Sequence, residues 1–164
     1  MKKPVTIVII AIIVIVFLTI NFKSTGLDII DYPIRHLYHA DMTHLATNTV
    51  SVIVLSFMEE ILGWKRYLFA ILFIWILSSM ILLLIHKMFP SRKVVTVGFS
   101  GVIFGLSVIY YKLLGASSSI TLVGLLISIV PQLLVPGISV EGHLSGIIAG
   151  IIYITLFPIE IENK

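Results

Sequence analysis

The chain of 164 residues contains no cysteine. Disulfide bonds, thiolate nucleophiles and thiolate metal sites are therefore excluded, and the redox compartment stays open. Charge is also scarce, since Asp, Glu, Lys and Arg make up 12% of the residues, against about a quarter in soluble domains. Lys and Arg never form a run longer than two residues, so the net charge of +3 gives no reason to expect a nucleic-acid partner.

Apolar residues are abundant instead. They account for 59% of the chain, and the mean hydropathy is +1.14. These values exclude an ordinary soluble domain and a disordered chain. A membrane-spanning helix needs about 20 residues, so the length allows roughly six spans and no separate soluble domain. We therefore expect residues 1–164 to form a single all-α, polytopic membrane domain.

The predicted spans are residues 5–22, 44–62, 67–85, 99–114, 120–135 and 143–159. The first and third contain no charged residue, whereas the second, fourth and sixth begin with polar or small residues. The first span could be a signal peptide, because Lys2 and Lys3 precede it. Its apolar run is longer than the usual signal core, and no A-x-A-like cleavage site follows before Lys23. We therefore expect a retained helix.

Charge counting gives little information on orientation. With an inside amino terminus, six basic residues lie inside and five lie outside, which is a weak positive-inside bias. Only the lysine pair at the amino terminus clearly indicates an inside location, for the amino terminus itself. We expect a multi-pass protein of a prokaryotic cell membrane with a cytoplasmic amino terminus.

The polar residues within the predicted spans occur at corresponding helix ends. His44 and Asn48 open the second span, Ser100 opens the fourth and His143 opens the sixth. Ionisable groups inside a membrane are costly and usually face a protein interior or a water-filled cavity. Spans two, four and six of a six-span chain run in the same direction, so these residues should converge in one leaflet.

Small residues support this convergence. Gly101 and Gly105 are four residues apart in the fourth span, as are Gly142, Gly146 and Gly150 in the sixth. Such spacing lets helix backbones approach closely, which would bring a serine and a histidine within hydrogen-bonding reach. The alternative is that these glycines only pack helices.

Four segments together resemble the rhomboid intramembrane serine proteases. Residues 39–48 read HADMTHLATN, residues 98–105 GFSGVIFG, residues 142–150 GHLSGIIAG and residues 59–63 EEILG. They are similar to the family's H-x(4)-H-x(3)-N, G-x-S-G, H-x-x-G-x-x-x-G and E-x-x-x-G motifs. The resemblance extends from about residue 35 to 157 and implies a bundle of six transmembrane helices.

The resemblance implies a catalytic dyad, with Ser100 as nucleophile and His143 as general base. It also implies an oxyanion hole formed by His44, Asn48 and the Ser100 backbone N–H. The resemblance assigns supporting roles to Phe104, which would stack on the catalytic histidine, and to Gly98, Gly101 and His39. The four-residue spacing assigns helix-packing roles to Gly105, Gly146 and Gly150. His39 would brace the first loop, although a solvated loop histidine is the alternative. No cofactor is implied.

Other positions fit the family pattern less well. Many rhomboids have Trp-Arg about eight residues before the first motif histidine, where this chain has Ile30-Asp31, so we expect a shortened or rebuilt first loop. Pro131 and Pro136 are expected either to help gate substrate entry, as proposed in the family, or simply to kink a helix near a turn.

The remaining histidines lie outside these motifs. We interpret His36 and His86 as loop or interface residues. A zinc site made of His36, His39 and Asp41 is the alternative, but the chain has no H-E-x-x-H motif.

The leading hypothesis is an endopeptidase that hydrolyses transmembrane helices near their outer ends, preferring small residues and readily unwound helices. Its partners would be transmembrane protein substrates and the lipid bilayer, and the oligomeric state is unknown. Two alternatives remain, namely an inactive rhomboid-like protein that binds membrane clients and a small transporter or channel subunit. Many transporters have an inverted repeat, which this sequence lacks.

Overall fold

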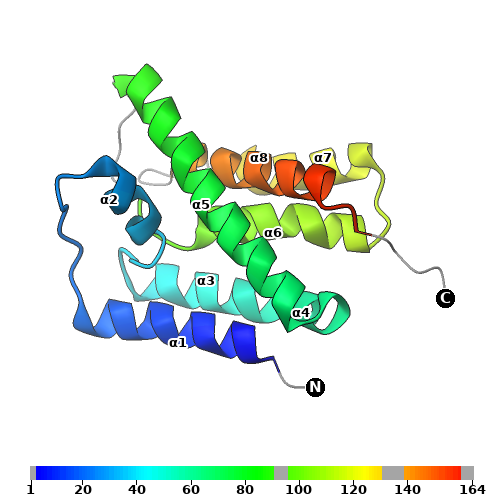
Figure 1. The fold of residues 1–164 in the computed structure, drawn as a ribbon, viewed down its shortest axis with the longest axis horizontal. Coiled ribbons are helices and arrows are strands. Elements are labelled where there is room, and N and C mark those ends of the chain that lie inside the picture. Colours follow the sequence, from blue (N-terminus) through cyan, green and yellow to red (C-terminus); the bar gives the residue numbers. More distant parts are fainter. Residues whose placement is uncertain (1–2, 91–95, 131–138, 160–164) are drawn as a thin grey trace.

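A computed structural model describes residues 3–90, 96–130 and 139–159, and the described part of the chain is all helical (Figure 1). Its helices are α1 (Pro4–Thr19), α2 (Asp28–Arg35), α3 (Met42–Leu55), α4 (Phe57–Leu62), α5 (Trp64–Met88), α6 (Ser100–Leu113), α7 (Ser118–Ile129) and α8 (Val140–Leu156). The predicted all-α class is confirmed. The six spans stay a prediction.

Within the described ranges, two helical segments are long and apolar enough to cross a membrane, namely Met42–Leu62, which joins α3 and α4, and Trp64–Met88. Helices α1, α6, α7 and α8 are apolar but shorter. The prolines at positions 131 and 136, for which we predict a gate or a kink, lie outside the described residues.

Helices α3, α6 and α8 run in the same direction, and their amino-terminal ends lie on the side of the bundle where α2 sits (Figure 1). Helix α5 crosses them diagonally, while α1 lies beside α3. The convergence that we expect from the parallel second, fourth and sixth spans is therefore present in the fold.

Glycine backbones form the contact between α6 and α8. A methyl group added at Gly146 would collide with the Gly101 carbonyl, and one added at Gly150 would collide with the Gly105 carbonyl. The two helices are thus close enough to exclude any side chain along this seam. The close approach fixes the position of the start of α8 relative to the start of α6.

At the opposite end of the bundle, the Glu59 carboxylate caps the start of α1. It accepts hydrogen bonds from the backbone N–H groups of Val5 at 2.8 Å and Thr6 at 2.9 Å, and from the Thr6 hydroxyl at 2.8 Å. A carboxylate is favourable there because the first N–H groups of a helix lack partners within the helix and carry partial positive charge. Glu59 therefore ties α4 to α1.

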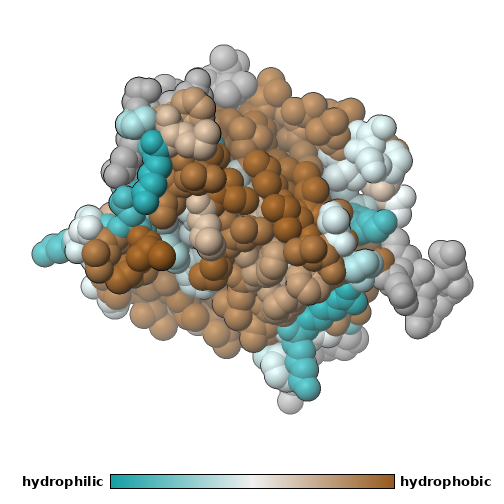
Figure 2. Space-filling view, turned by 45° about the horizontal axis from the view of Figure 1, so that its top comes forward, coloured by the Kyte–Doolittle hydropathy of each residue, from teal (hydrophilic) through white to brown (hydrophobic). Residues whose placement is uncertain are grey.

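The surface of the bundle is apolar over a broad central area, with hydrophilic residues toward two ends (Figure 2). Large apolar side chains are exposed on several helices, among them Ile15 of α1, Val54 of α3, Met80 of α5 and Ile127 of α7. A soluble monomer rarely exposes so continuous an apolar surface. The fold therefore has the apolar outer surface of a protein that contacts lipid.

Candidate active site

Ser100 and His143 form a hydrogen bond across the α6–α8 seam. The Ser100 Oγ lies 2.9 Å from His143 Nε2. Ser100 is the first residue of α6 and His143 lies in the first turn of α8, so the two side chains come from 43 residues apart in sequence to meet at matching helix ends. A serine hydroxyl within hydrogen-bonding reach of an imidazole is the arrangement of a base-activated nucleophile.

The His143 ring is held by Phe104, one turn beyond Ser100 on α6. The two rings are stacked, with centroids 4.4 Å apart and an interplanar angle of 25°. The second ring nitrogen of His143, Nδ1, is buried and has no hydrogen-bond partner among the described residues. Stacking on the ring face can orient the imidazole, which in a Ser-His-Asp triad is done by a carboxylate hydrogen-bonded to Nδ1.

His44 and Asn48 lie on α3, beside the turn that precedes Ser100. A methyl group added at Gly98 would collide with the His44 ring and would lie 3.4 Å from Asn48 Nδ2. Gly98 also has a φ of 114°, a backbone conformation that glycine adopts readily and other residues avoid. Only glycine therefore fits at this position, on grounds of both space and conformation.

Two kinds of donor are available at the turn formed by Gly98, Phe99 and Ser100. The Asn48 amide nitrogen is buried and has no hydrogen-bond partner among the described residues. The Ser100 backbone N–H belongs to the first turn of α6, where N–H groups have no acceptor within the helix. Both suit an oxyanion, which needs donors aimed at it in a dry site.

His39 lies behind His44, with the ring centroids 5.1 Å apart in an edge-to-face contact. The side chain of His39 is buried, so the interpretation of a solvated loop residue is wrong, while its bracing role stays a prediction. Burial, together with the neighbouring His44, lowers the pKa of His39 to about 4. The ring is thus neutral at pH 7.

The segment before His39 forms helix α2, which packs on α5; that this loop is shortened or rebuilt relative to other rhomboids stays a prediction. The Trp75 Nε1 donates to the Pro33 carbonyl at 2.7 Å, and the Tyr32 hydroxyl is hydrogen-bonded to His86 Nδ1 at 2.7 Å. His36 and His86 are both buried. They are interface residues between elements, one of the two roles predicted for them.

The sequence did not lead us to expect that α2 contacts the turn around Ser100, formed by Gly98 to Gly101. The Gly98 N–H donates to the Arg35 carbonyl at 3.0 Å, and the His36 ring packs on Gly101. The buried residues Asp31, Tyr32, Arg35 and His36 are spaced as one face of a helix, a pattern that could have indicated a packed element. His36, His39 and Asp41 do not gather into a metal-binding group.

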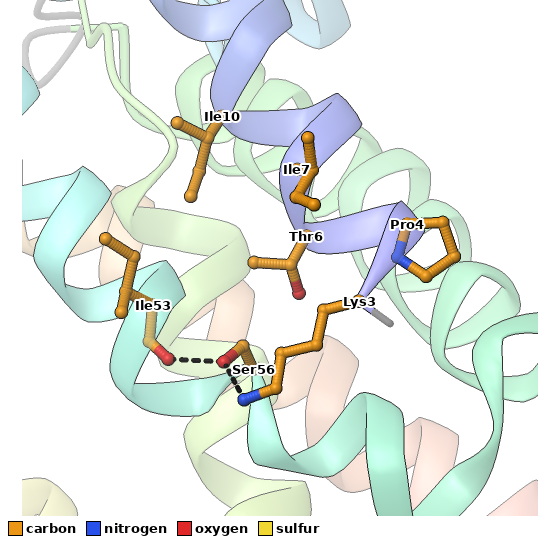
Figure 3. Close-up of a pocket in the computed structure, with 7 residues that line it drawn as sticks. All are labelled: Lys3, Pro4, Thr6, Ile7, Ile10, Ile53 and Ser56. Atoms are coloured by element: carbon orange, nitrogen blue, oxygen red, sulfur yellow. Dashed lines mark hydrogen bonds between the residues drawn. The ribbon is translucent and has the colours of Figure 1, made fainter. Parts of the chain in front are cut away.

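A hollow of about 520 Å³ lies elsewhere on the molecule, and Figure 3 shows the residues that line it. It is open to the surface between α1 and the end of α3, lined by Lys3, Pro4, Thr6, Ile7, Ile10, Ile53 and Ser56. Ser56 follows His44 by twelve residues, and a helix rises about 1.5 Å per residue, so some 18 Å separate the two ends. This hollow contains none of the candidate catalytic residues.

Comparison with known proteins gives a consistent assignment. The Rhomboid domain family matches residues 28–159. The chain is 51% identical over 159 residues to a protein of Acanthamoeba polyphaga mimivirus that is named a putative rhomboid protein, and the match covers 97% of this chain and 93% of the viral protein.

Relatives in bacteria are more distant. The chain is 34% identical over 129 residues to an uncharacterised protein of Mycobacterium tuberculosis and 29% identical over 126 residues to one of Mycobacterium leprae. These matches cover 71% and 70% of this chain but 54% and 50% of the mycobacterial proteins. No solved structure matches the chain. Because the relatives come from a virus and from bacteria, the prokaryotic membrane stays a prediction.

Proposed function

The chain belongs to the rhomboid family, and on that premise we propose that it is an intramembrane serine endopeptidase with Ser100 as nucleophile and His143 as general base. The observation that carries the proposal is the 2.9 Å hydrogen bond between Ser100 Oγ and His143 Nε2. It is supported by the stacking of Phe104 on the His143 ring.

The first half of the reaction forms an acyl-enzyme. The Ser100 oxygen attacks the scissile carbonyl carbon while His143 Nε2 takes the hydroxyl proton. The tetrahedral intermediate collapses as His143 returns that proton to the leaving amine, and the carboxyl-terminal peptide departs. This sequence requires Nε2 to begin without a proton, so the neutral ring carries its proton on Nδ1.

The second half hydrolyses the ester. A water molecule gives a proton to His143 Nε2 and its oxygen attacks the acyl carbon. His143 then returns the proton to Ser100, and the product leaves with a new carboxyl group. In both halves the negative charge on the carbonyl oxygen would be stabilised by Asn48, His44 and the Ser100 N–H.

The proposed substrates are transmembrane segments of other proteins, cut near their outer ends. Family membership and the apolar outer surface support a location in a membrane. Because the candidate site lies at the amino-terminal ends of α3, α6 and α8, a substrate helix would have to unwind near one face of the bilayer. This favours segments with small, helix-destabilising residues at the cut.

The proposal is tested by covalent labelling of Ser100 in detergent or liposomes. A fluorophosphonate probe should label the wild-type chain and should not label Ser100→Ala, and His143→Ala should label at least about 100-fold more slowly because the nucleophile loses its base. Cleavage of a model transmembrane substrate should follow the same order.

Ser107→Ala is the matched control, because Ser107 lies on the same helix and its hydroxyl donates to the Ile103 carbonyl at 3.0 Å. It should label like the wild type. Labelling of Ser100→Ala would remove Ser100 as the nucleophile. A folded wild-type chain that neither labels nor cleaves would instead be an inactive rhomboid-like binding protein.

A further inference from the structure

His36 is a buried polar residue for which the proposed mechanism has no role. It follows α2 directly and is 5% exposed. Both ring nitrogens are buried and have no hydrogen-bond partner among the described residues. The Gly98 backbone is the polar group that interacts with this ring. Burying a polar group with so little compensation costs free energy.

The His36 ring packs directly beside the nucleophile. A methyl group added at Gly101 would lie 3.0 Å from the His36 Cε1 atom and 3.1 Å from the Gly142 carbonyl oxygen. The imidazole therefore packs on Gly101, the residue after Ser100 in α6. The start of α8 packs on the same residue, through the Gly142 carbonyl. Removing the ring would leave the first turn of α6 unsupported on this side.

The residue before His36 holds the other side of the same turn. The Arg35 carbonyl accepts the Gly98 N–H at 3.0 Å, so Arg35 and His36 together contact the residues that flank Phe99 and Ser100. That hydrogen bond also commits the Gly98 N–H to α2. The Gly98 N–H is therefore not available to an oxyanion.

Helix α2 is itself anchored on α5, and this limits how far the Gly98–Gly101 turn, which contacts α2, can move. The Trp75 indole donates to the Pro33 carbonyl, and Tyr32 is hydrogen-bonded to His86, which fixes α2 on α5. Tyr32 also packs under Arg35, whose guanidinium carbon lies 4.6 Å from the tyrosine ring centroid. Helix α2, which His36 follows directly, is thereby held on α5, and the His36 ring packs against Gly101 of α6.

Proton transfer by His36 is not required for this role. Burial lowers the pKa of His36 to about 4, so its ring is neutral at pH 7. No contact joins it to the His143 ring among those found in the described residues. Its effect on the reaction would pass through the backbone of Gly98 and Gly101.

Resting on the proposed function, we propose that His36 is a positioning residue: its ring, set between α2 and α6, fixes the Gly98–Gly101 turn so that the Ser100 hydroxyl faces His143. A displacement of about 1 Å at a reacting atom can cost about 100-fold in rate. Loss of the ring should thus slow the chemical step without weakening substrate binding.

The test measures both the rate constant and the amplitude of Ser100 labelling by a fluorophosphonate. His36→Ala should lower the rate constant about 10- to 100-fold at full amplitude. The kcat for a transmembrane substrate should fall in parallel, and the KM should stay within about threefold. A purely structural role would lower the amplitude, through loss of folded protein, and leave the rate constant of the folded fraction unchanged.

Two further variants keep the test decisive. His36→Leu keeps the side-chain volume and should recover the rate constant to within about fivefold of the wild type. If His36→Ala does not fold, His36→Val takes its place with an expected loss of at least about fivefold. Tyr38→Ala is the control from the same loop, since Tyr38 packs edge-to-face on Phe22 at 5.1 Å, and it should label at the wild-type rate.

A rate constant for His36→Ala within about twofold of the wild type would overturn the inference while leaving Ser100 as the nucleophile. Failure of the folded wild type to label would overturn the proposed function, and the inference with it.

Discussion

Asn48 is a buried amide whose nitrogen has no hydrogen-bond partner among the described residues. Buried donors are almost always satisfied in folded proteins, and an amide left open beside the Ser100 turn is suited to a partner that forms only during the reaction. A developing oxyanion is such a partner.

Asn48→Ala should therefore lower the kcat for a transmembrane substrate about 10- to 100-fold, because one oxyanion donor is lost in a dry site. The KM should change by less than about threefold, since the amide acts on the transition state. Steady-state cleavage in liposomes separates the two constants.

Asn48→Asp gives the matched comparison at the same volume. An aspartate replaces the donor NH2 group with an acceptor oxygen and adds a negative charge that would repel the oxyanion, so its kcat should fall below that of Asn48→Ala. If, in each variant, kcat falls only as far as the yield of folded protein falls, Asn48 has a role in folding instead.

At the scale of helices, the seam between α6 and α8 sets the distance between Ser100 and His143. Because Gly146 lies against the Gly101 backbone, any side chain at position 146 must push the helices apart. The carbonyl oxygens of the seam cannot move aside as a flexible side chain would.

Gly146→Ala should reduce the rate constant of Ser100 labelling about 100-fold, because it separates the reacting side chains. Overpacking should also lower the free energy of unfolding by about 1–3 kcal/mol. Labelling kinetics and thermal unfolding in detergent measure the two effects. Ile148→Leu, on the exposed face of α8, should change neither, and wild-type labelling by Gly146→Ala would contradict the proposed role of the seam.

The cap on α1 is a second element-level feature, and it lies away from the candidate site. Glu59→Ala should lower the free energy of unfolding by about 1–3 kcal/mol, because it leaves buried N–H groups of α1 without acceptors. Labelling of Ser100 should keep its wild-type rate constant at temperatures where the variant is folded.

Glu60→Ala is the matched control, one residue further along α4. Glu60 Oε1 lies 3.4 Å from Lys3 Nζ, and both side chains are 31% exposed. A pair at that exposure contributes about 0–1 kcal/mol. If thermal unfolding shows equal destabilisation by both substitutions, the capping interpretation is wrong.

At the scale of the whole molecule, a small cluster of polar side chains lies within a bundle whose outer surface is apolar. The outer surface is broadly apolar (Figure 2), while Ser100, His143, His44 and Asn48 come together at one end of three parallel helices. In a bilayer this arrangement would surround the candidate dyad largely with apolar groups, among which electrostatic interactions are stronger than in water. The same end carries α2, so the loop between α1 and α3 closes one side of the site.

Much of this could be predicted from the sequence. The scarcity of charge and the six apolar runs indicate an all-helical membrane protein, because hydropathy acts on each segment alone. The spacing of Gly101 with Gly105 and of Gly142 with Gly146 indicates a close helix pair, because residues four apart share a helix face. Their motif context indicates Ser100, His143, His44 and Asn48 as candidates.

Only the tertiary structure decided what α2 does. Helix α2 has eight residues, and its place depends on partners far along the chain, such as Trp75 and His86. The buried position of His36 against Gly101 likewise joins segments 65 residues apart in sequence. Local periodicity shows which face of a segment is buried, whereas the partner of that face is set by packing across the whole bundle.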